Sequence, residues 1–155
     1  MAPAAPAGHV PVLVRRLPNF PADWPLPDYA TAGSAAVDLR NAGPGFVLPS
    51  LGRHLVPTGL AIALPDGTEA QIRPRSGLAF RRGIGIVNSP CTIDSDYRGE
   101  IRIPLINLDG SPQEVEHGER IAQLMVSRVA RIAWHPADVL PETERGAGGF
   151  GSTGR

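Results

Sequence analysis

Glycine and proline are spread along almost the whole chain and break its apolar stretches into short pieces. The 155 residues include 18 Gly and 17 Pro. They gather only at the two ends, where residues 1–8 read MAPAAPAG and residues 146–155 read GAGGFGSTGR. Because proline interrupts helices and central strands, and glycine weakens both, this spacing is typical of many short strands joined by turns. The sequence therefore predicts an all-β fold of sandwich or jelly-roll type.

Eight stretches have the length and apolar content of strands. In residues 100–108, apolar side chains alternate around Arg102, as expected for a half-buried strand. Pro104 interrupts that stretch, so we expect a sheet edge or a bulge there. No stretch keeps a helical period for more than the one or two turns possible at 76–82. The eight expected strands are 10–17, 36–40, 46–48, 54–64, 69–73, 84–87, 100–108 and 121–129.

The composition fits one globular domain and excludes several classes of protein. Hydrophobic residues make up 42% of the chain, enough for a core. Fifteen basic and fifteen acidic residues cancel, which argues against a nucleic-acid or membrane-surface binder. All the basic residues are arginine, so a phosphate-binding loop of the Walker type and Schiff-base chemistry are excluded.

The cysteine and hydropathy patterns point to a cytoplasmic protein. Cys91 is the one cysteine, so neither an intrachain disulfide nor a thiolate metal site is possible. No apolar run approaches the roughly 20 residues that a membrane span requires. The N-terminus lacks the basic and apolar regions of a secretory signal. We therefore expect a cytoplasmic location.

The glycine-rich tail allows two interpretations. Residues 146–151 match the pattern GxGxxG, but the strand before it and the helix after it that a dinucleotide fold requires are missing. A flexible terminus without a role is the simpler interpretation. The other interpretation is a segment that orders over a ligand. Arg145, Phe150 and Ser152 favour it, because an arginine can donate two parallel hydrogen bonds to a phosphate, a phenylalanine can stack on a base, and a serine supplies a hydroxyl.

Three internal segments also combine charged and small residues. Residues 73–79 place Ser76 and Gly77 beside two arginines, which suits either an anion site or an ordinary helix cap. Residues 88–100 hold three acids, a tyrosine and an arginine; taken alone, they read as a solvated turn more readily than as a catalytic one. If that segment is extended, Asp94 and Asp96 point the same way. Residues 118–124, taken alone, simply begin a strand.

In order, these segments resemble the five motifs of the trimeric deoxyuridine triphosphate nucleotidohydrolases, or dUTPases. The resemblance covers about residues 10–155. It implies a jelly-roll-like (β-clip) subunit with one very short helix and a flexible glycine-rich C-terminal tail. The five motifs are 32–39 (AGSAAVDL), 74–79 (PRSGLA), 93–100 (IDSDYRGE), 118–124 (GERIAQL) and 145–154 (RGAGGFGSTG).

The resemblance also implies a domain organisation, an assembly and a reaction. Residues 1–9 would be a disordered extension, 10–142 the β domain, and 143–155 an arm that closes over a neighbouring subunit's active site. The chain would form a homotrimer with active sites between subunits. With Mg²⁺, it would hydrolyse dUTP to dUMP and pyrophosphate, which keeps uracil out of DNA and supplies dUMP for thymidylate synthesis.

The third motif carries the residues for catalysis and base selection. By resemblance, Asp94 is the general base that orients a water for attack on the α-phosphorus. Asn88 and the hairpin backbone, including Thr92 and Ile93, would read the uracil edge and exclude the methyl group of thymine. Tyr97 would lie against the deoxyribose and exclude a 2′-hydroxyl.

The other motifs would hold the triphosphate. The resemblance assigns Arg75, Ser76, Gly77 and Gln123 to the phosphate oxygens. It assigns Asp38 to the Mg²⁺ ion, through water, with the metal held mainly by the triphosphate.

In the arm, Arg145 would cover the γ-phosphate and Phe150 would stack on uracil, with Gly151 and Ser152 also contacting the substrate.

One departure from the family and two alternative functions remain open at this point. Cys91 follows Pro90 where the family usually has glycine, so either the turn is of another type or it stores strain. A dCTP deaminase, or a bifunctional deaminase and dUTPase, is related in fold and also trimeric. A nucleotide-sensing protein without catalysis is the other alternative.

Overall fold

The structure, a computed structural model, describes residues 8–152. Residues 1–7 of the expected N-terminal extension and residues 153–155 of the expected tail lie outside that range. Strands dominate the described chain and a single short helix accompanies them there, which confirms the all-β prediction. The elements are β1 (Leu13–Arg16), β2 (Val37–Arg40), β3 (Phe46–Leu48), β4 (Arg53–Ala63), β5 (Thr68–Arg73), α1 (Ser76–Arg82), β6 (Ile84–Ile86), β7 (Cys91–Ile93), β8 (Glu100–Asn107), β9 (Gln113–Val115) and β10 (Arg120–Arg128).

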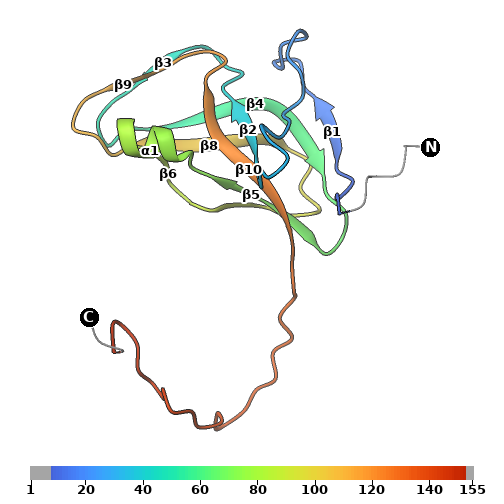
Figure 1. Ribbon diagram of the computed structural model, residues 1–155, viewed down its shortest axis with the longest axis vertical. Helices are drawn as coiled ribbons and strands as arrows, with labels where there is room; N and C mark the ends of the chain where they lie inside the picture. The colour runs from blue at the N-terminus through green and yellow to red at the C-terminus, as the bar shows by residue number, and fades with distance from the viewer. Residues whose placement is uncertain (1–7, 153–155) are drawn as a thin grey trace.

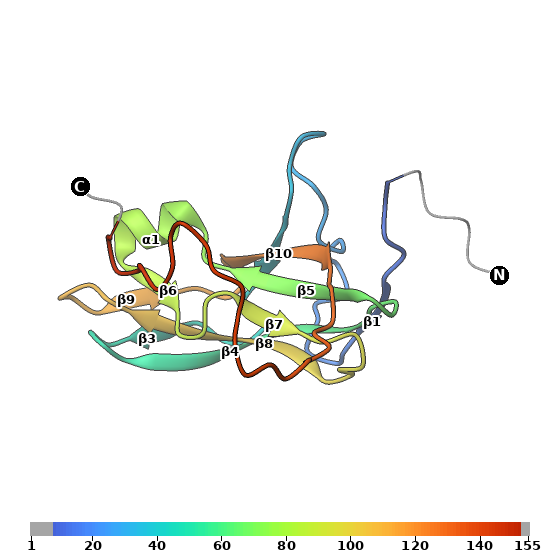
Figure 2. The same ribbon diagram turned by 90° about the horizontal axis from the view of Figure 1, so that it is seen from below.

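The strands form two four-stranded antiparallel sheets and a small two-stranded ribbon (Figure 1). The first sheet has the order β1-β4-β8-β6, and the second has the order β2-β10-β5-β7. Strands β3 and β9 pair with each other. Figure 2 shows the two larger sheets as stacked layers, with β5 and β10 in one and β4 and β8 in the other.

The core lies between these layers. Burial alternates along β8, where Ile101, Ile103 and Leu105 are buried and the residues between them are not. Ile72 of β5 and Ala122 of β10 are completely buried as well. Each sheet thus has one apolar face on the core, which is the pattern that a half-buried antiparallel strand predicts.

Pro104 lies in an interior strand, but at a place that tolerates proline. Strand β8 pairs with β4 through Pro104, whereas its pairing with β6 ends at Leu105. On the β6 side, the Pro104 carbonyl accepts a hydrogen bond from the Val87 amide at 3.0 Å, just beyond the end of β6. In an antiparallel strand the N–H and C=O of one residue point to the same side, so the N–H that proline lacks would also point past the end of β6. The strand is therefore not a sheet edge at Pro104, and the bulge does not lie there. The irregularity between β4 and β8 lies elsewhere, between Pro57 and Ala61.

Two short strands and one turn differ from expectation. Strands β7 and β9, of three residues each, were not among the expected strands. Strand β1 is shorter than the expected 10–17. The backbone turns after β7, where the Tyr97 amide bonds the Asp94 carbonyl at 3.1 Å. Asp94 and Asp96 therefore do not share a face of an extended segment.

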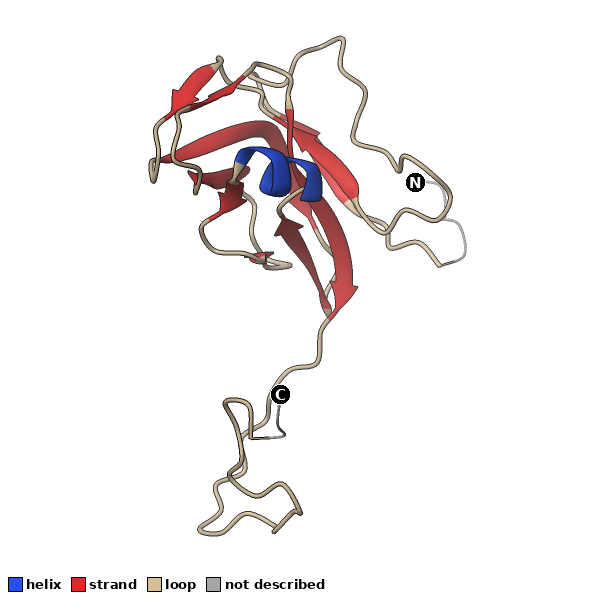
Figure 3. Ribbon diagram, turned by 60° about the vertical axis from the view of Figure 1, so that its left-hand side comes forward, coloured by secondary structure: helices blue, strands red, loops and turns tan. Residues whose placement is uncertain are grey.

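The helix α1 is held at its C-terminal end by a glycine. Gly83 has φ +61°, and a Cβ atom there would lie 2.7 Å from the Asp109 amide nitrogen. Only glycine combines that conformation with that close approach. The helix, shown in blue in Figure 3, therefore stops at Arg82 and turns directly into β6.

Beyond β10, residues 129–152 leave the sheets as an extended arm without helix or strand (Figures 1 and 3). Its large apolar side chains are exposed, including Ile132, Trp134, Val139 and Leu140; the Trp134 side chain is 84% exposed. Within this chain the arm therefore buries almost none of its apolar surface.

Candidate active site

Three of the five motif segments meet at one edge of the second sheet. Strand β10 lies between β2 and β5, and Gln123 is the register partner of both Asp38 and Arg73. Directly paired residues project from the same face, so the motif side chains on these strands lie side by side. The chain thus places Asp38 and Gln123 next to the turn that carries Arg75.

Asp38 is the centre of the polar contacts in this group. Its Oδ1 forms an ion pair with Arg75 Nε at 3.0 Å, and its Oδ2 accepts from Arg120 Nη1 at 3.3 Å. Arg75 Nη1 also donates to the Arg120 carbonyl at 2.9 Å, and Gln123 Nε2 donates to the Pro74 carbonyl at 2.8 Å. These bonds tie the second motif to the first and the fourth.

Ser76 and Gly77 open the helix α1 beside this cluster. Ser76 is the first helical residue and is exposed, while Arg75 occupies the cap position without a side-chain cap bond. The alternative interpretation of Ser76 as an ordinary helix cap is therefore wrong. Ser76 is exposed and directly follows Arg75 in the chain.

The third motif is carried by a connection between the two sheets. Strand β6 belongs to the first sheet and β7 to the second, so residues 87–90 cross from one layer to the other. Thr92 is exposed in β7, and Ile93 pairs with Ala70 of β5. Asp94 follows at the strand's end, and Asn88 is exposed at the start of the crossing.

The turn before Cys91 is of another type than the family's glycine suggests. The Ser89–Pro90 peptide bond is cis, and Cys91 does not adopt a positive φ. Its side chain is buried in β7, opposite Ile72 of β5. Of the two alternatives, the structure therefore has the turn of another type, and Cys91 does not hold the strained positive φ.

Tyr97 is held in place by two later residues of the same motif, Gly99 and Glu100. Its hydroxyl donates to the Glu100 carbonyl at 3.0 Å. A Cβ atom at Gly99 would lie 2.3 Å from the Tyr97 oxygen, so only a glycine leaves room for the ring in this position. No local pattern of residues predicts this contact.

Glu100 anchors the end of the same motif. Its Oε1 accepts from Asn19 Nδ2 at 2.8 Å and from the Gly59 amide at 2.9 Å, while Oε2 accepts from Arg102 Nε at 2.9 Å. Burial acts to raise the pKa of this carboxyl, but the hydrogen bonds and the Arg102 charge outweigh it and hold the pKa below its ordinary value.

The structure does not bring the third motif to the other three within one chain. Asp38 lies on β2 and Asp94 follows β7, and these strands are at opposite edges of the second sheet. Three strand spacings separate them, which amounts to about 14 Å. The arm residues form a third group: Arg145 Nε bonds the Gly148 carbonyl of the arm itself, and Phe150, Gly151 and Ser152 are exposed.

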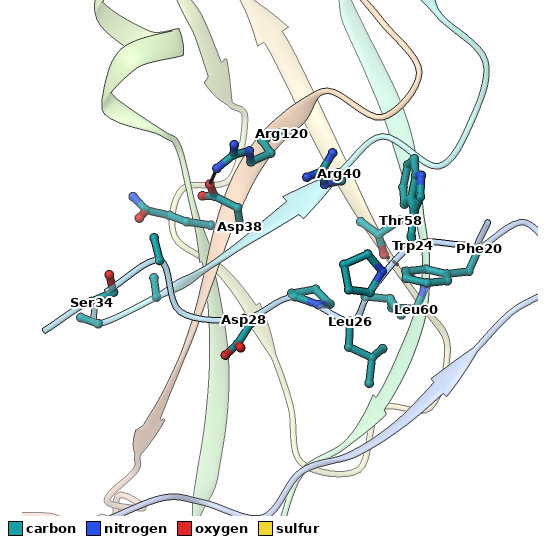
Figure 4. Close-up of a pocket in the computed structure, with 16 residues that line it drawn as sticks. Phe20, Trp24, Leu26, Asp28, Ser34, Asp38, Arg40, Thr58, Leu60 and Arg120 are labelled. Atoms are coloured by element: carbon teal, nitrogen blue, oxygen red, sulfur yellow. Dashed lines mark hydrogen bonds and ion pairs between the residues drawn. The ribbon is translucent and has the colours of Figure 1, made fainter. Parts of the chain in front are cut away.

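A cavity of about 460 Å³ adjoins the first group (Figure 4). Asp38, Arg120 and Gln123 line one end of it. At the other end the ring of Trp24 lies under the Arg40 guanidinium, 5.7 Å from ring centre to the guanidinium carbon. Arg120 was not predicted as a site residue, although it lies inside the fourth motif. No local sequence pattern predicts that Trp24 and Arg40 line this cavity.

Two further features of the described residues bear on the site. Between residues 8 and 152, no three His, Cys, Asp or Glu side chains gather closely enough to hold a metal ion. Over the same part of the chain, α1 is far too short to cross a membrane, and no longer apolar helix is present.

Known proteins resemble this chain over most of its length. The model of the dUTPase family matches residues 22–154. The deoxyuridine 5′-triphosphate nucleotidohydrolase of Wolbachia sp. subsp. Brugia malayi is 56% identical over 136 residues, which cover 86% of this chain and 87% of that protein. The corresponding protein of Rickettsia typhi is 52% identical over 146 residues, covering 94% of this chain and 97% of the relative.

Solved structures share the fold. A mutant dUTPase of Staphylococcus bacteriophage 80alpha with dUpNHpp superposes with a TM-score of 0.80 at 22% identity, covering 94% of this chain and 99% of the other. A mutant dUTPase from phage phi11 of S. aureus, described with a structural Mg(II) ion, has a TM-score of 0.73 at 18% identity, covering 85% and 99%. The jelly-roll-like prediction is thereby confirmed. Since the family match spans all five motifs in order and two relatives exceed half identity, the chain belongs to the dUTPase family.

Proposed function

We propose that this chain is a dUTP diphosphatase, which hydrolyses dUTP to dUMP and pyrophosphate. The observation that carries the proposal is the family match over residues 22–154, because that range contains every motif position to which a role is assigned. The comparisons do not favour the deaminase and nucleotide-sensing alternatives, since the named relatives are deoxyuridine triphosphate nucleotidohydrolases. The product dUMP is the precursor that thymidylate synthesis consumes.

The reaction needs an aligned water and neutralised phosphates rather than a covalent intermediate. The Asp94 carboxylate orients a water and accepts its proton as the water's oxygen attacks the α-phosphorus. The bond between that phosphorus and the oxygen bridging to the β-phosphorus breaks, so dUMP and pyrophosphate leave. A positioned general base of this kind contributes about 10²- to 10⁴-fold to the rate.

The phosphate oxygens are held by the group around Asp38. Arg75 and Gln123 already lie together there, with Ser76 and Gly77 at the start of α1. Arginine suits this role because its planar fork donates two parallel hydrogen bonds to a phosphate.

Selectivity for the base and the sugar comes from the third motif. The backbone of residues 88–94 reads the uracil edge, with Asn88, Thr92 and Ile93 in the hairpin. Tyr97 lies against the deoxyribose and leaves no room for a 2′-hydroxyl. The support for this role is that the hydroxyl bond and the missing Gly99 side chain fix the ring before substrate arrives.

A homotrimer with shared sites unites groups that a single chain keeps apart. Asp94 lies about three strand spacings, or about 14 Å, from Asp38 in the same sheet, too far for both to act on one triphosphate. Residues 129–140 also expose several large apolar side chains, which is typical of a surface that is buried against another subunit. In the trimer, residues 143–155 close over a neighbour's site, where Arg145 and Phe150 meet the γ-phosphate and the base.

The donor set fits a Mg²⁺ ion that arrives with the substrate. Asp38 offers a carboxylate beside the phosphate-binding residues, and a full protein cage is absent from residues 8–152. Proteins commonly bind Mg²⁺ through one or two carboxylates together with substrate phosphates. When bound, the ion neutralises phosphate charge, and Asp38 holds it through water.

A nucleotide screen tests the proposal. With Mg²⁺, the full chain should release pyrophosphate from dUTP and leave dTTP, UTP and dCTP almost untouched. Ammonia release from dCTP is measured in parallel. Ammonia production would support the deaminase, and binding of dUTP without any pyrophosphate release would support a nucleotide sensor.

A further inference from the structure

Arg81 lies over the first turn of α1, although its Cα atom is in the last turn. A Cβ atom built on Gly77 would lie 2.8 Å from Arg81 Nη2, so the guanidinium covers the space that a side chain at Gly77 would fill. The two residues are four apart in the helix and therefore neighbours on its surface, and helical side chains lean toward the N-terminus. The arginine thus brings its charge next to Ser76 and Gly77.

The other arginines around α1 already have partners. Arg75 and Arg120 pair with Asp38, and Arg82 pairs with Glu119. Arg73 donates to the Gln71 side chain. The charges of Arg75, Arg120 and Arg82 are therefore neutralised by carboxylates, and the N–H donors of Arg73 are used by a neighbouring side chain.

Arg81 differs from all of them. Among residues 8–152 it forms neither a hydrogen bond nor an ion pair, and it is exposed. A guanidinium carries five N–H donors in a rigid fork and is weakly hydrated, which favours bidentate binding of phosphate. An uncompensated guanidinium lying against a bare glycine therefore has its donors free for an anionic ligand.

We propose that Arg81 is a further substrate-binding residue, which holds the β- and γ-phosphates of dUTP beside Ser76 and Gly77. The inference rests on the proposed function for the identity of the ligand, and on the side-chain placement for the site. It also assigns a second role to Gly77, which leaves the space that the Arg81 guanidinium occupies.

The experiment compares Arg81→Met with the matched control Arg15→Met. Arg15 is exposed on β1, at the opposite edge of its sheet from β6, the strand that follows α1. In Arg81→Met, the KM for dUTP and the inhibition constant of inorganic pyrophosphate should each rise about tenfold or more, since a hydrogen bond to a charged group is lost. Inhibition by deoxyuridine, which lacks phosphate, should stay unchanged. Arg81→Lys should recover part of the loss, and Arg15→Met should match the wild type.

Three outcomes overturn the inference. They are a pyrophosphate affinity of Arg81→Met equal to that of the control, a fall in deoxyuridine affinity by the same factor, and a lowered melting temperature that accounts for the whole loss. Calorimetric titration of the wild type and Arg81→Met with pyrophosphate separates this inference from the proposed function. If the wild type binds pyrophosphate through Arg81 but does not hydrolyse dUTP, the proposed function fails and the anion site stands.

Discussion

At the scale of single residues, the site depends on side chains whose neighbours hold them in place. Asp38 has two guanidinium partners, and Tyr97 has a hydroxyl bond and a bare glycine beside it. Asp94 differs, because it stands at the end of β7 with its backbone in a turn. Asp38 and Tyr97 are thus held in place by their neighbours, whereas Asp94, the proposed general base, is exposed at the end of its strand.

Asp94→Asn should abolish turnover while the nucleotide still binds. The amide keeps the shape of the side chain but does not accept a proton from water, so we expect a fall in kcat of about 10²-fold or more. Single-turnover hydrolysis and the dissociation constant of a non-hydrolysable dUTP analogue are the two measurements. Weak binding combined with normal chemistry per complex would contradict the role of Asp94.

Gly99→Ala should reduce the discrimination between dUTP and UTP. The new methyl group would lie 2.3 Å from the Tyr97 oxygen, so the ring must move off its position. We expect the ratio of kcat/KM for dUTP over UTP to fall about tenfold, the size of effect that a steric contact supplies. Gly110→Ala is the control, since a Cβ atom there meets nothing within 4 Å. An unchanged ratio in Gly99→Ala would show that Tyr97 does not set sugar selectivity.

At the scale of elements, α1 is held to the sheet at both ends. Arg75 and Gln123 connect its start to β10 and to the preceding turn. At its end, Arg82 Nη1 bonds Glu119 at 2.5 Å, and the same guanidinium contacts Gln113 and the Glu114 carbonyl. The turn that is proposed to bind phosphate is thus held by contacts on either side of it.

Arg82→Met should weaken both the fold and phosphate binding. The change leaves Glu119 without its cation, which we expect to lower the free energy of unfolding by about 1 kcal/mol for this half-buried pair. Because α1 is less firmly placed, the KM for dUTP should rise while the dUTP over dTTP preference stays constant. Thermal denaturation and steady-state kinetics measure the two effects, with Arg128→Met as the control. A loss of base preference would show that Arg82 acts on more than α1.

Glu100 should make stability depend on pH on the acid side. Its folded pKa lies below the ordinary value of 4.5, so the stabilisation is fully present above that value and is lost as the pH falls through the folded pKa. We expect the melting temperature of the wild type to fall in this range more steeply than that of Glu100→Gln. Parallel slopes in the two proteins would contradict the anchoring role of the carboxylate.

Most strands could be predicted from the sequence, but their pairing could not. The alternation in residues 100–108 is local, so it predicted β8 correctly. Strands β7 and β9 are three residues long and are stabilised by the neighbours β5 and β3, which no local pattern reveals. The residues around Cys91 left the type of its turn open, and the structure shows a cis bond before Pro90 and no positive φ at Cys91.

At the scale of the whole molecule, a single described chain does not bring the five motifs together. The first, second and fourth motifs meet in space, the third lies across the sheet, and the arm extends away from both. The motif order along the sequence could predict the family, but it could not say which motifs share a subunit. The strand order β2-β10-β5-β7 shows that the third motif lies apart from the first, second and fourth within one chain.

Truncation after Glu144 should lower kcat strongly and leave the assembly intact. The change removes Arg145 and Phe150, which are proposed to cover a neighbour's site, and keeps the apolar residues 132–140 for contact between subunits. Sedimentation measures the assembly, and dUTP hydrolysis measures the site. Dissociation into monomers would show instead that the last residues hold the subunits together.

Mixing two inactive variants tests the shared site most directly. Asp94→Asn and Arg75→Met are each expected to be inactive alone. If each site takes Asp94 from one subunit and Arg75 from another, trimers refolded from an equal mixture regain about one quarter of the wild-type activity, because both intact residues meet at that fraction of sites. Activity that stays at the level of the separate variants would place Asp94 and Arg75 in the same chain's site and contradict the account.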